Sequence, residues 1–161
     1  MIFVTVGTDL PFDRMVKVID HWARTNDRRD VFAQIGEGGW EPGYIPFVPF
    51  LQPAEYMGYF TAASVIIAHA GMGTILAALH HGKPILVMPK KASLGEQRNE
   101  HQTATARRMM KMGGVNVAFD EHELRERLNH VDDLASGRRI GTFASASLVS
   151  GLREFIFAHQ S

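Results

Sequence analysis

The stretch that most constrains the fold runs from residue 64 to residue 89 and reads SVIIAHAGMGTILAALHHGKPILVMP. A short apolar run ends in a turn of small residues, and an apolar helical pattern follows, closed by Gly82-Lys83-Pro84. A second apolar run then covers residues 85–88. A strand, a turn, a helix and a strand in this order predict two parallel strands joined by a right-handed crossover. We therefore expect an α/β protein.

The turn over residues 69–74 is suited to hold a ligand. Gly71 and Gly73 lack a Cβ atom, so their backbone N–H groups can approach a bound group closely. A helix that begins at Gly73 and Thr74 points its unpaired N–H groups and the positive end of its dipole at the same place, where a phosphate is the expected guest. The turn matches neither a Walker A loop nor GxGxxG, whose third glycine would fall at Leu76. Taken alone, it is equally compatible with a turn that only packs strand against helix.

Strands and helices alternate along the rest of the chain. Further strands are expected at residues 2–6, 31–35 and 115–119, with a short one within residues 44–51. Helices are expected at residues 12–23, 53–62 and 101–112, after an N-cap at Asp120, and after a break near Gly137 with Leu148, Leu152, Phe155 and Ile156 on one face. This alternation, without repeats or a linker, predicts a single domain over residues 1–161. It would be a doubly wound, Rossmann-like domain with a mostly parallel sheet.

Several candidate contact segments follow strands of this sheet. Gly7-Thr8, Phe50-Leu51, residues 69–74 and the loop after Met88 all stand where a strand ends. Open α/β sheets bind ligands outside the carboxyl ends of their strands. We therefore expect these segments to converge on one site.

Composition excludes several classes of function. Seventeen basic and seventeen acidic residues cancel, so nothing suggests a nucleic-acid partner. The absence of cysteine excludes disulfides and thiolate metal sites and fits a reducing compartment. No apolar run reaches the length of a membrane span, and the amino end lacks the basic region of a signal peptide. These last three features lead us to expect a cytoplasmic protein. No histidines have zinc-ligand spacing and no GxSxG motif occurs, so we expect neither a metal site nor a hydrolase triad.

Several spaced motifs together resemble glycosyltransferase family 28, and within it the C-terminal, donor-binding domain. They are His69-Ala70-Gly71-x-Gly73-Thr74-Ile75, Leu79, Gly82-Lys83-Pro84 and His101-Gln102. The opening, Val4 to Thr8 with Pro11-Phe12-Asp13, is similar to that of small stand-alone members. These include PssE-type exopolysaccharide transferase subunits and the cytosolic subunit of the two-part UDP-GlcNAc transferase. The resemblance covers residues 1 to about 114 and implies the fold of the C-terminal half of a GT-B glycosyltransferase.

The resemblance also implies which residues contact a UDP-sugar. His101 and Gln102 would face hydroxyls of the sugar and ribose, the alternative being a helix-start pair in water. Phe50 and Leu51 would flank the uracil, or form an ordinary core pair at a strand end. The implied nucleotide-sugar-binding set is Gly7, Thr8, Phe50, Leu51, His69, Gly71, Met72, Gly73, Thr74, His101 and Gln102.

Two further positions bear on this site. By the resemblance, family members commonly carry an acidic residue that binds the ribose where this chain has Ala77. Its loss should weaken ribose binding by about 1–3 kcal/mol if nothing replaces it. Lys90, Lys91 and Arg98 could add positive charge near a diphosphate, although at least two of them are expected to be solvated.

The expected activity is transfer of a sugar from a UDP-sugar to a lipid-linked saccharide, with inversion. The chain has no Asp-x-Asp motif to hold a divalent metal, so a helix N-terminus and hydroxyls would stabilise the leaving diphosphate without metal or other cofactor. Because the chain has room for only one GT-B domain, the resemblance places the acceptor site and general base on a membrane-associated partner subunit. No catalytic residue is assigned here. A non-catalytic nucleotide-sugar-binding scaffold and, with less support, a UDP-sugar epimerase remain alternatives, and the donor sugar stays open.

Overall fold

The computed structural model describes residues 1–134. The expected break near Gly137 and the helix with Leu148, Leu152, Phe155 and Ile156 lie outside the described residues. Within the described part, no helix is both long enough and apolar enough to cross a membrane.

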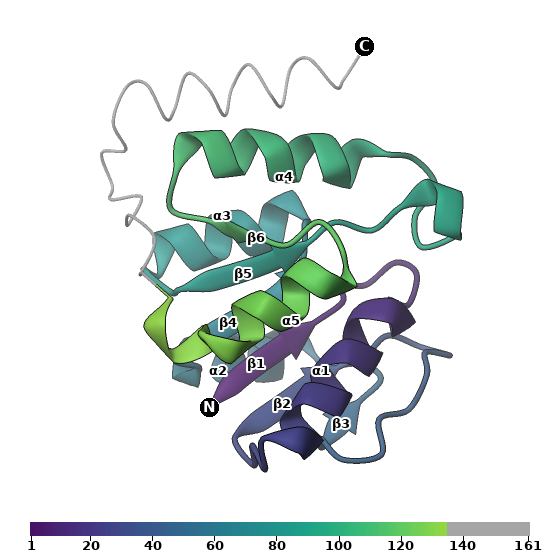
Figure 1. The fold of residues 1–161 in the computed structure, drawn as a ribbon, viewed down its shortest axis with the longest axis vertical. Helices are drawn as coiled ribbons and strands as arrows, with labels where there is room; N and C mark the ends of the chain where they lie inside the picture. The colour runs from purple at the N-terminus through teal and green to yellow at the C-terminus, as the bar shows by residue number, and fades with distance from the viewer. Residues whose placement is uncertain (135–161) are drawn as a thin grey trace.

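The described residues form a six-stranded, all-parallel sheet in the order β3-β2-β1-β4-β5-β6 (Figure 1). From β1 the chain first builds outward through β2 to β3, then returns to the other side of β1 and builds outward again. The order therefore reverses between β1 and β4, which confirms the doubly wound fold. The strands are β1 (Ile2–Thr5), β2 (Val31–Gln34), β3 (Phe47–Val48), β4 (Val65–His69), β5 (Ile85–Met88) and β6 (Asn116–Val117).

Helices cover both faces of the sheet. In Figure 1, α1 and α5 lie in front of it and α2 and α3 lie behind it. The helices are α1 (Asp13–Thr25), α2 (Pro53–Ala62), α3 (Met72–His80), α4 (His101–Met112) and α5 (Glu121–Asn129), with one-turn 3-10 helices η1 (Ala92–Leu94) and η2 (Val131–Asp133).

Two apolar cores result, one on each face. Val4 and Ile67 belong to the core beneath α1 and α5, whereas Phe3 and Ile66 belong to the core beneath α2, α3 and α4. Neighbouring residues of one strand thus point into opposite cores. This is why the central strands are continuous apolar runs in the sequence.

Local signals set most element ends as expected. The carboxylate of Asp120 accepts a hydrogen bond from the Glu123 backbone N–H at 2.8 Å and caps α5. Gly113 follows α4 with a φ of 79°. The helix expected to begin at Gly73 instead begins at Met72, because Gly71 in an extended conformation is its N-cap.

Candidate functional site

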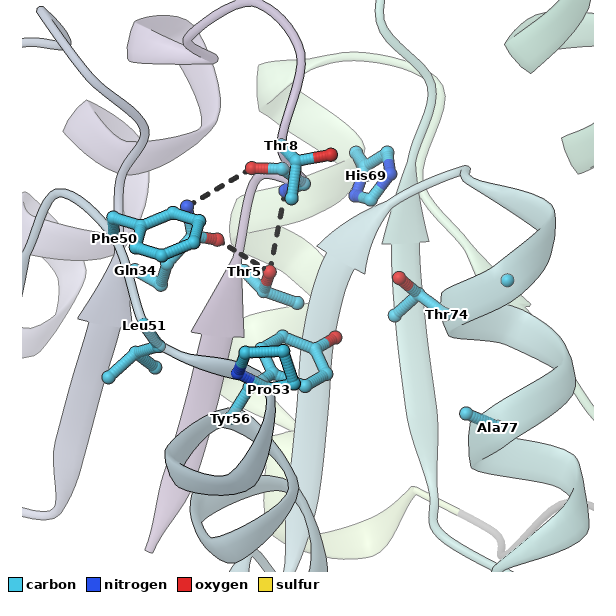
Figure 2. Close-up of a pocket in the computed structure, with 12 residues that line it drawn as sticks. Thr5, Thr8, Gln34, Phe50, Leu51, Pro53, Tyr56, His69, Thr74 and Ala77 are labelled. Carbon is cyan, nitrogen blue, oxygen red and sulfur yellow. Dashed lines mark hydrogen bonds between the residues drawn. The ribbon is translucent and has the colours of Figure 1, made fainter.

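A cavity of about 410 Å³ opens at the carboxyl edge of the sheet, where the strand order reverses (Figure 2). Its volume is in the range of small-molecule sites, roughly 300–1,000 Å³. In Figure 2, Phe50, Leu51 and Pro53 lie on one side of it and Thr74 and Ala77 of α3 on the other. Its lining residues are Thr5, Gly7, Thr8, Gln34, Phe50, Leu51, Pro53, Tyr56, His69, Gly73, Thr74 and Ala77.

The cavity brings together segments expected from the sequence to meet. It gathers residues that end or follow β1, β3 and β4, namely Gly7, Thr8, Phe50, Leu51, His69, Gly73 and Thr74. The loop after β5, the fourth expected segment, contributes no lining residue, and neither do Gly71, Met72, His101 and Gln102.

The residues outside the lining have other contacts. The Gln102 side chain is buried, and its Oε1 accepts a hydrogen bond from the Lys90 backbone N–H at 3.1 Å. His101 is exposed at the start of α4, and its backbone N–H donates to Asn99 Oδ1 at 3.1 Å. Gly71 lies behind the lining, against His69.

The imidazole of His69 is held between two glycines. A Cβ atom added at Gly7 would lie 2.8 Å from His69 Cε1 and Nε2, and one added at Gly71 would lie 2.8 Å from Cδ2, 2.9 Å from Cε1 and still closer to Nε2. Gly7 also has a φ of +84°, which favours glycine. Glycine is therefore required at both positions to admit the ring.

His69 is neutral at pH 7. Burial lowers its pKa to about 4, and the nearby charge of Lys90 lowers it further in the same direction. Its Nδ1 atom is buried and has no hydrogen-bond partner among the described residues. A neutral ring of this kind can take part in hydrogen bonds to a ligand but is too weak a base to accept a proton near neutral pH.

Thr5 and Gln34 fix the floor of the cavity. The Thr5 hydroxyl donates to Gln34 Oε1 at 2.7 Å. The Gln34 amide group donates to the carbonyl oxygens of Gly7 at 3.0 Å and Pro49 at 3.1 Å. These bonds tie together the ends of β1 and β2 and the segment after β3. Sequence reasoning missed this pair, although a polar residue at the end of an otherwise apolar strand was a usable signal.

Two lining residues of α2 and the preceding loop add aromatic surface. The Tyr56 hydroxyl interacts with those of Thr74 and Thr5, and burial raises the pKa of Tyr56, which keeps it protonated. Phe50 is 47% exposed, so the alternative that it is a core residue is wrong. The sequence alone did not indicate Tyr56, because an aromatic residue within a helix is typical of ordinary packing.

The amino end of α3 borders the same cavity. Gly71 has no side chain to cap the helix, and the first helical bond runs from the Ile75 N–H to the Gly71 carbonyl at 3.1 Å. The N–H groups of Met72, Gly73 and Thr74 precede that bond and are the donors that a helix start leaves unpaired. A Cβ atom at Gly73 would meet no atom within 4 Å, so this glycine leaves open space beside the cavity.

Among the described residues, no charged side chain lines the cavity. Ala77 lines the cavity, and no carboxylate does. Of the three basic residues expected nearby, Arg98 is exposed, Lys91 is half-buried and Lys90 is fully buried. No group of three or more acidic or histidine side chains in the described residues is arranged to hold a metal ion.

Comparison with protein families assigns most of the chain to a known family. Residues 1–138 match the family described as "Glycosyltransferase family 28 C-terminal domain". The UDP-N-acetylglucosamine–N-acetylmuramyl-(pentapeptide) pyrophosphoryl-undecaprenol N-acetylglucosamine transferase of Solibacter usitatus (strain Ellin6076) is 29% identical over 118 residues, covering 72% of this chain. The chain spans only 29% of that relative's length.

Solved structures share the fold. The solution structure of ALG13 matches with a TM-score of 0.57 at 18% identity, covering 84% of this chain and 87% of that one. Os79 from O. sativa, in complex with UDP, matches with a TM-score of 0.59 at 17% identity, covering 82% of this chain and 31% of that one. At these identities the likeness supports the fold alone.

Proposed function

The chain belongs to the glycosyltransferase family 28 C-terminal domain family, and from that premise we propose that it is the donor-binding subunit of a split, inverting glycosyltransferase. It would transfer a sugar from a UDP-sugar to a lipid-linked saccharide in polysaccharide or glycolipid synthesis. The observation that carries this proposal is the cavity at the strand-order reversal, bordered by the open amino end of α3.

The diphosphate of the donor would bind at that helix end. The backbone N–H groups of Gly73 and Thr74, the Thr74 hydroxyl and the Thr8 hydroxyl supply uncharged donors, and the helix dipole favours an anion there. Charge on the diphosphate increases as the bond to the sugar breaks. Fixed donors aimed at that charge stabilise the transition state without a metal ion.

The uracil would lie on the opposite side of the cavity. Phe50 presents an exposed ring there, beside Leu51 and Pro53. A planar base can stack on such a ring and against these apolar groups. The Tyr56 hydroxyl, which interacts with the Thr74 hydroxyl, is available to the ribose in place of the missing acidic residue at Ala77.

The proton of the acceptor needs a base that this cavity does not supply. In an inverting transfer the acceptor hydroxyl attacks the anomeric carbon, the bond from that carbon to the UDP oxygen breaks, and the hydroxyl proton passes to a base. The described lining holds no carboxylate, and the pKa of His69 of about 4 makes it a poor base at neutral pH.

We therefore assign the base and the acceptor site to a membrane-associated partner subunit, which would hold this chain at the cytoplasmic face. The Solibacter relative is named for a pyrophosphoryl-undecaprenol acceptor. That relative is also more than three times as long as the segment that matches this chain. ALG13, by contrast, is a structural neighbour whose whole chain is almost entirely covered. Both facts suit a donor-binding domain that works with a separate acceptor-binding chain.

A second candidate is a non-catalytic nucleotide-sugar-binding scaffold. It is favoured by Ala77 and by the absence of any acidic group from the described lining. Binding would then occur without transfer, even with the partner present.

The nucleotide assignment can be tested with two matched glycines. Gly73 and Gly58 are both helical, and a Cβ atom at either would meet nothing within 4 Å, but only Gly73 lines the cavity. By calorimetry we expect Gly73→Val to abolish UDP binding and Gly58→Val to retain it. Normal UDP binding by folded Gly73→Val would rule out a phosphate at the start of α3.

The division of labour needs a transfer assay. A radiolabelled UDP-sugar and a lipid-linked acceptor are incubated with this chain, with the partner, and with both. We expect transfer only with both proteins. Efficient transfer by this chain alone would contradict the split enzyme, and binding without transfer by the pair would favour the scaffold.

A further inference from the structure

A buried lysine lies beside the cavity, and the proposed chemistry does not use it. Lys90 follows β5 and is only 1% exposed. Its ammonium group donates a hydrogen bond to the Leu10 carbonyl and lies 5.9 Å from the centre of the Phe12 ring. Burying an ammonium group costs folding free energy, so a fold that keeps one buried is expected to use it for binding or positioning.

That hydrogen bond holds the loop between β1 and α1. Thr8 and Asp9 are exposed, and in the described part of the chain the bond from Lys90 is the only hydrogen bond made to residues 8–10. The same loop begins with Gly7 and Thr8, which line the cavity. Gly7 is also held by hydrogen bonds to Gln34 and Thr5, so the bond from Lys90 bears mainly on the residues that follow it.

The ammonium group of Lys90 has a carbonyl partner but, among the described residues, no carboxylate within ion-pair distance. Asp9 and Glu96 act on it from farther away, and Glu96 is bound to Arg14 at 2.7 Å. Its charge lowers the pKa of His69, which lines the cavity and is neutral. An anion bound beyond that ring would be a complementary charge in a poorly solvated place.

We propose that Lys90 is a positioning residue for the donor: its ammonium group holds the loop over residues 7–11 against the cavity and favours the diphosphate through space. This inference rests on the proposed function, because it takes the ligand to be a UDP-sugar. Lys90 is not itself one of the lining residues, so it would act through the loop and through its charge.

The proposal predicts a pH dependence of binding. Burial lowers the pKa of Lys90 to about 8, against the opposing effect of Asp9 and Glu96. Below that pH the amine is charged and the loop is held. Above it the charge is lost, so affinity for UDP should fall as pH rises through 8. The second ionisation of a phosphate group, near pH 6, is complete by then, and the pKa of Tyr56 is raised above its ordinary value of 10.

Calorimetric titration of UDP into the full chain from pH 7 to pH 10 tests this dependence. For the wild type we expect affinity to fall by about tenfold in total between pH 8 and pH 10, and no more steeply than tenfold per pH unit, the limit for one linked proton. Lys90→Arg keeps the charge and should show no such fall. Lys90→Met should bind about tenfold more weakly at pH 7, with a flat profile.

Lys83 provides the matched control. Its ammonium group also donates to backbone carbonyl groups, those of Thr61 and Ala63, but it does not line or border the cavity. Lys83→Met should keep the wild-type affinity and pH profile. If the role of Lys90 were purely structural, Lys90→Met would change stability as Lys83→Met does. The pH dependence of UDP binding would then be the same as in the wild type.

The outcomes separate the two proposals. A flat wild-type profile between pH 7 and pH 10, or wild-type affinity in Lys90→Met, would overturn the role of Lys90 and leave the nucleotide site intact. Absence of UDP binding by the wild type at every pH would refute the proposed function, and this inference with it. If Lys90→Met does not fold, the comparison of wild type with Lys90→Arg decides alone.

Discussion

The contact between Gly71 and His69 allows a quantitative prediction. A Cβ atom at Gly71 would lie 2.8–2.9 Å from two ring carbons of His69 and closer to Nε2. Ordinary carbon contacts are about 3.5–4.0 Å, so the overlap exceeds about 0.5 Å at several atoms. The ring cannot withdraw freely, because Gly7 lies against it on the other side.

We expect Gly71→Ala to lower the free energy of unfolding by about 1–3 kcal/mol, the usual cost of overpacking. The φ of −81° at Gly71 suits alanine, so the loss comes from the contact and not from the backbone. Gly73→Ala is the control, because its Cβ atom meets nothing, and it should raise stability by about 0.5–1 kcal/mol. Urea denaturation measures both.

A double-mutant cycle isolates the contact. In the background of His69→Ala the ring is gone, and Gly71→Ala should cost nothing, so the two substitutions should couple by at least about 1 kcal/mol. Additive effects within about 0.5 kcal/mol, or a Gly71→Ala variant as stable as the wild type, would refute the reasoning.

Three further predictions concern stability and catalysis. The pKa of His69 is about 4 in the folded protein and about 6.5 in the unfolded chain. Its contribution to the free energy of unfolding is therefore complete above pH 6.5 and declines by about 3 kcal/mol as pH falls through 4. Urea midpoints measured against pH should show this decline in the wild type and not in His69→Gln. Buried Asp20 accepts bonds from the backbone N–H groups of Tyr44 at 2.8 Å and Ile45 at 2.9 Å, so Asp20→Ala should cost about 2–4 kcal/mol in urea denaturation and Asp20→Asn clearly less. EDTA should leave the transferase activity of the assembled enzyme unchanged, and a loss restored by magnesium or manganese would contradict metal-independent transfer.

The sequence predicted the fold well because its signals are local. Apolar runs bounded by glycine mark strands buried on both faces, and Asp120 and Gly113 mark helix ends through their own chemistry. The residues that follow β1, β3 and β4 could be placed together because parallel strands end at one edge. Their roles in binding stay predictions.

The rest depended on contacts that no spacing shows. Tyr56 reaches the cavity only because α2 begins beside the end of β1, where its hydroxyl interacts with that of Thr5. Lys90 stands in a polar stretch that suggests solvent, yet the chain turns it inward to the Leu10 carbonyl. The Gln102 side chain accepts a hydrogen bond from the Lys90 backbone N–H, and so it lies outside the cavity lining.

The central place of β1 has a consequence for how the chain folds. Its two neighbours come from very different distances along the chain: Ile2 pairs with Val31 in β2 and with Val65 in β4. The half-sheet of β1, β2 and β3 can assemble early, but one edge of β1 then stays open, with apolar residues unpaired, until β4 joins. A fragment that ends before β4 would present that edge to other copies and aggregate. The cavity, which lies on the seam between the halves, can form only once β4 has joined β1.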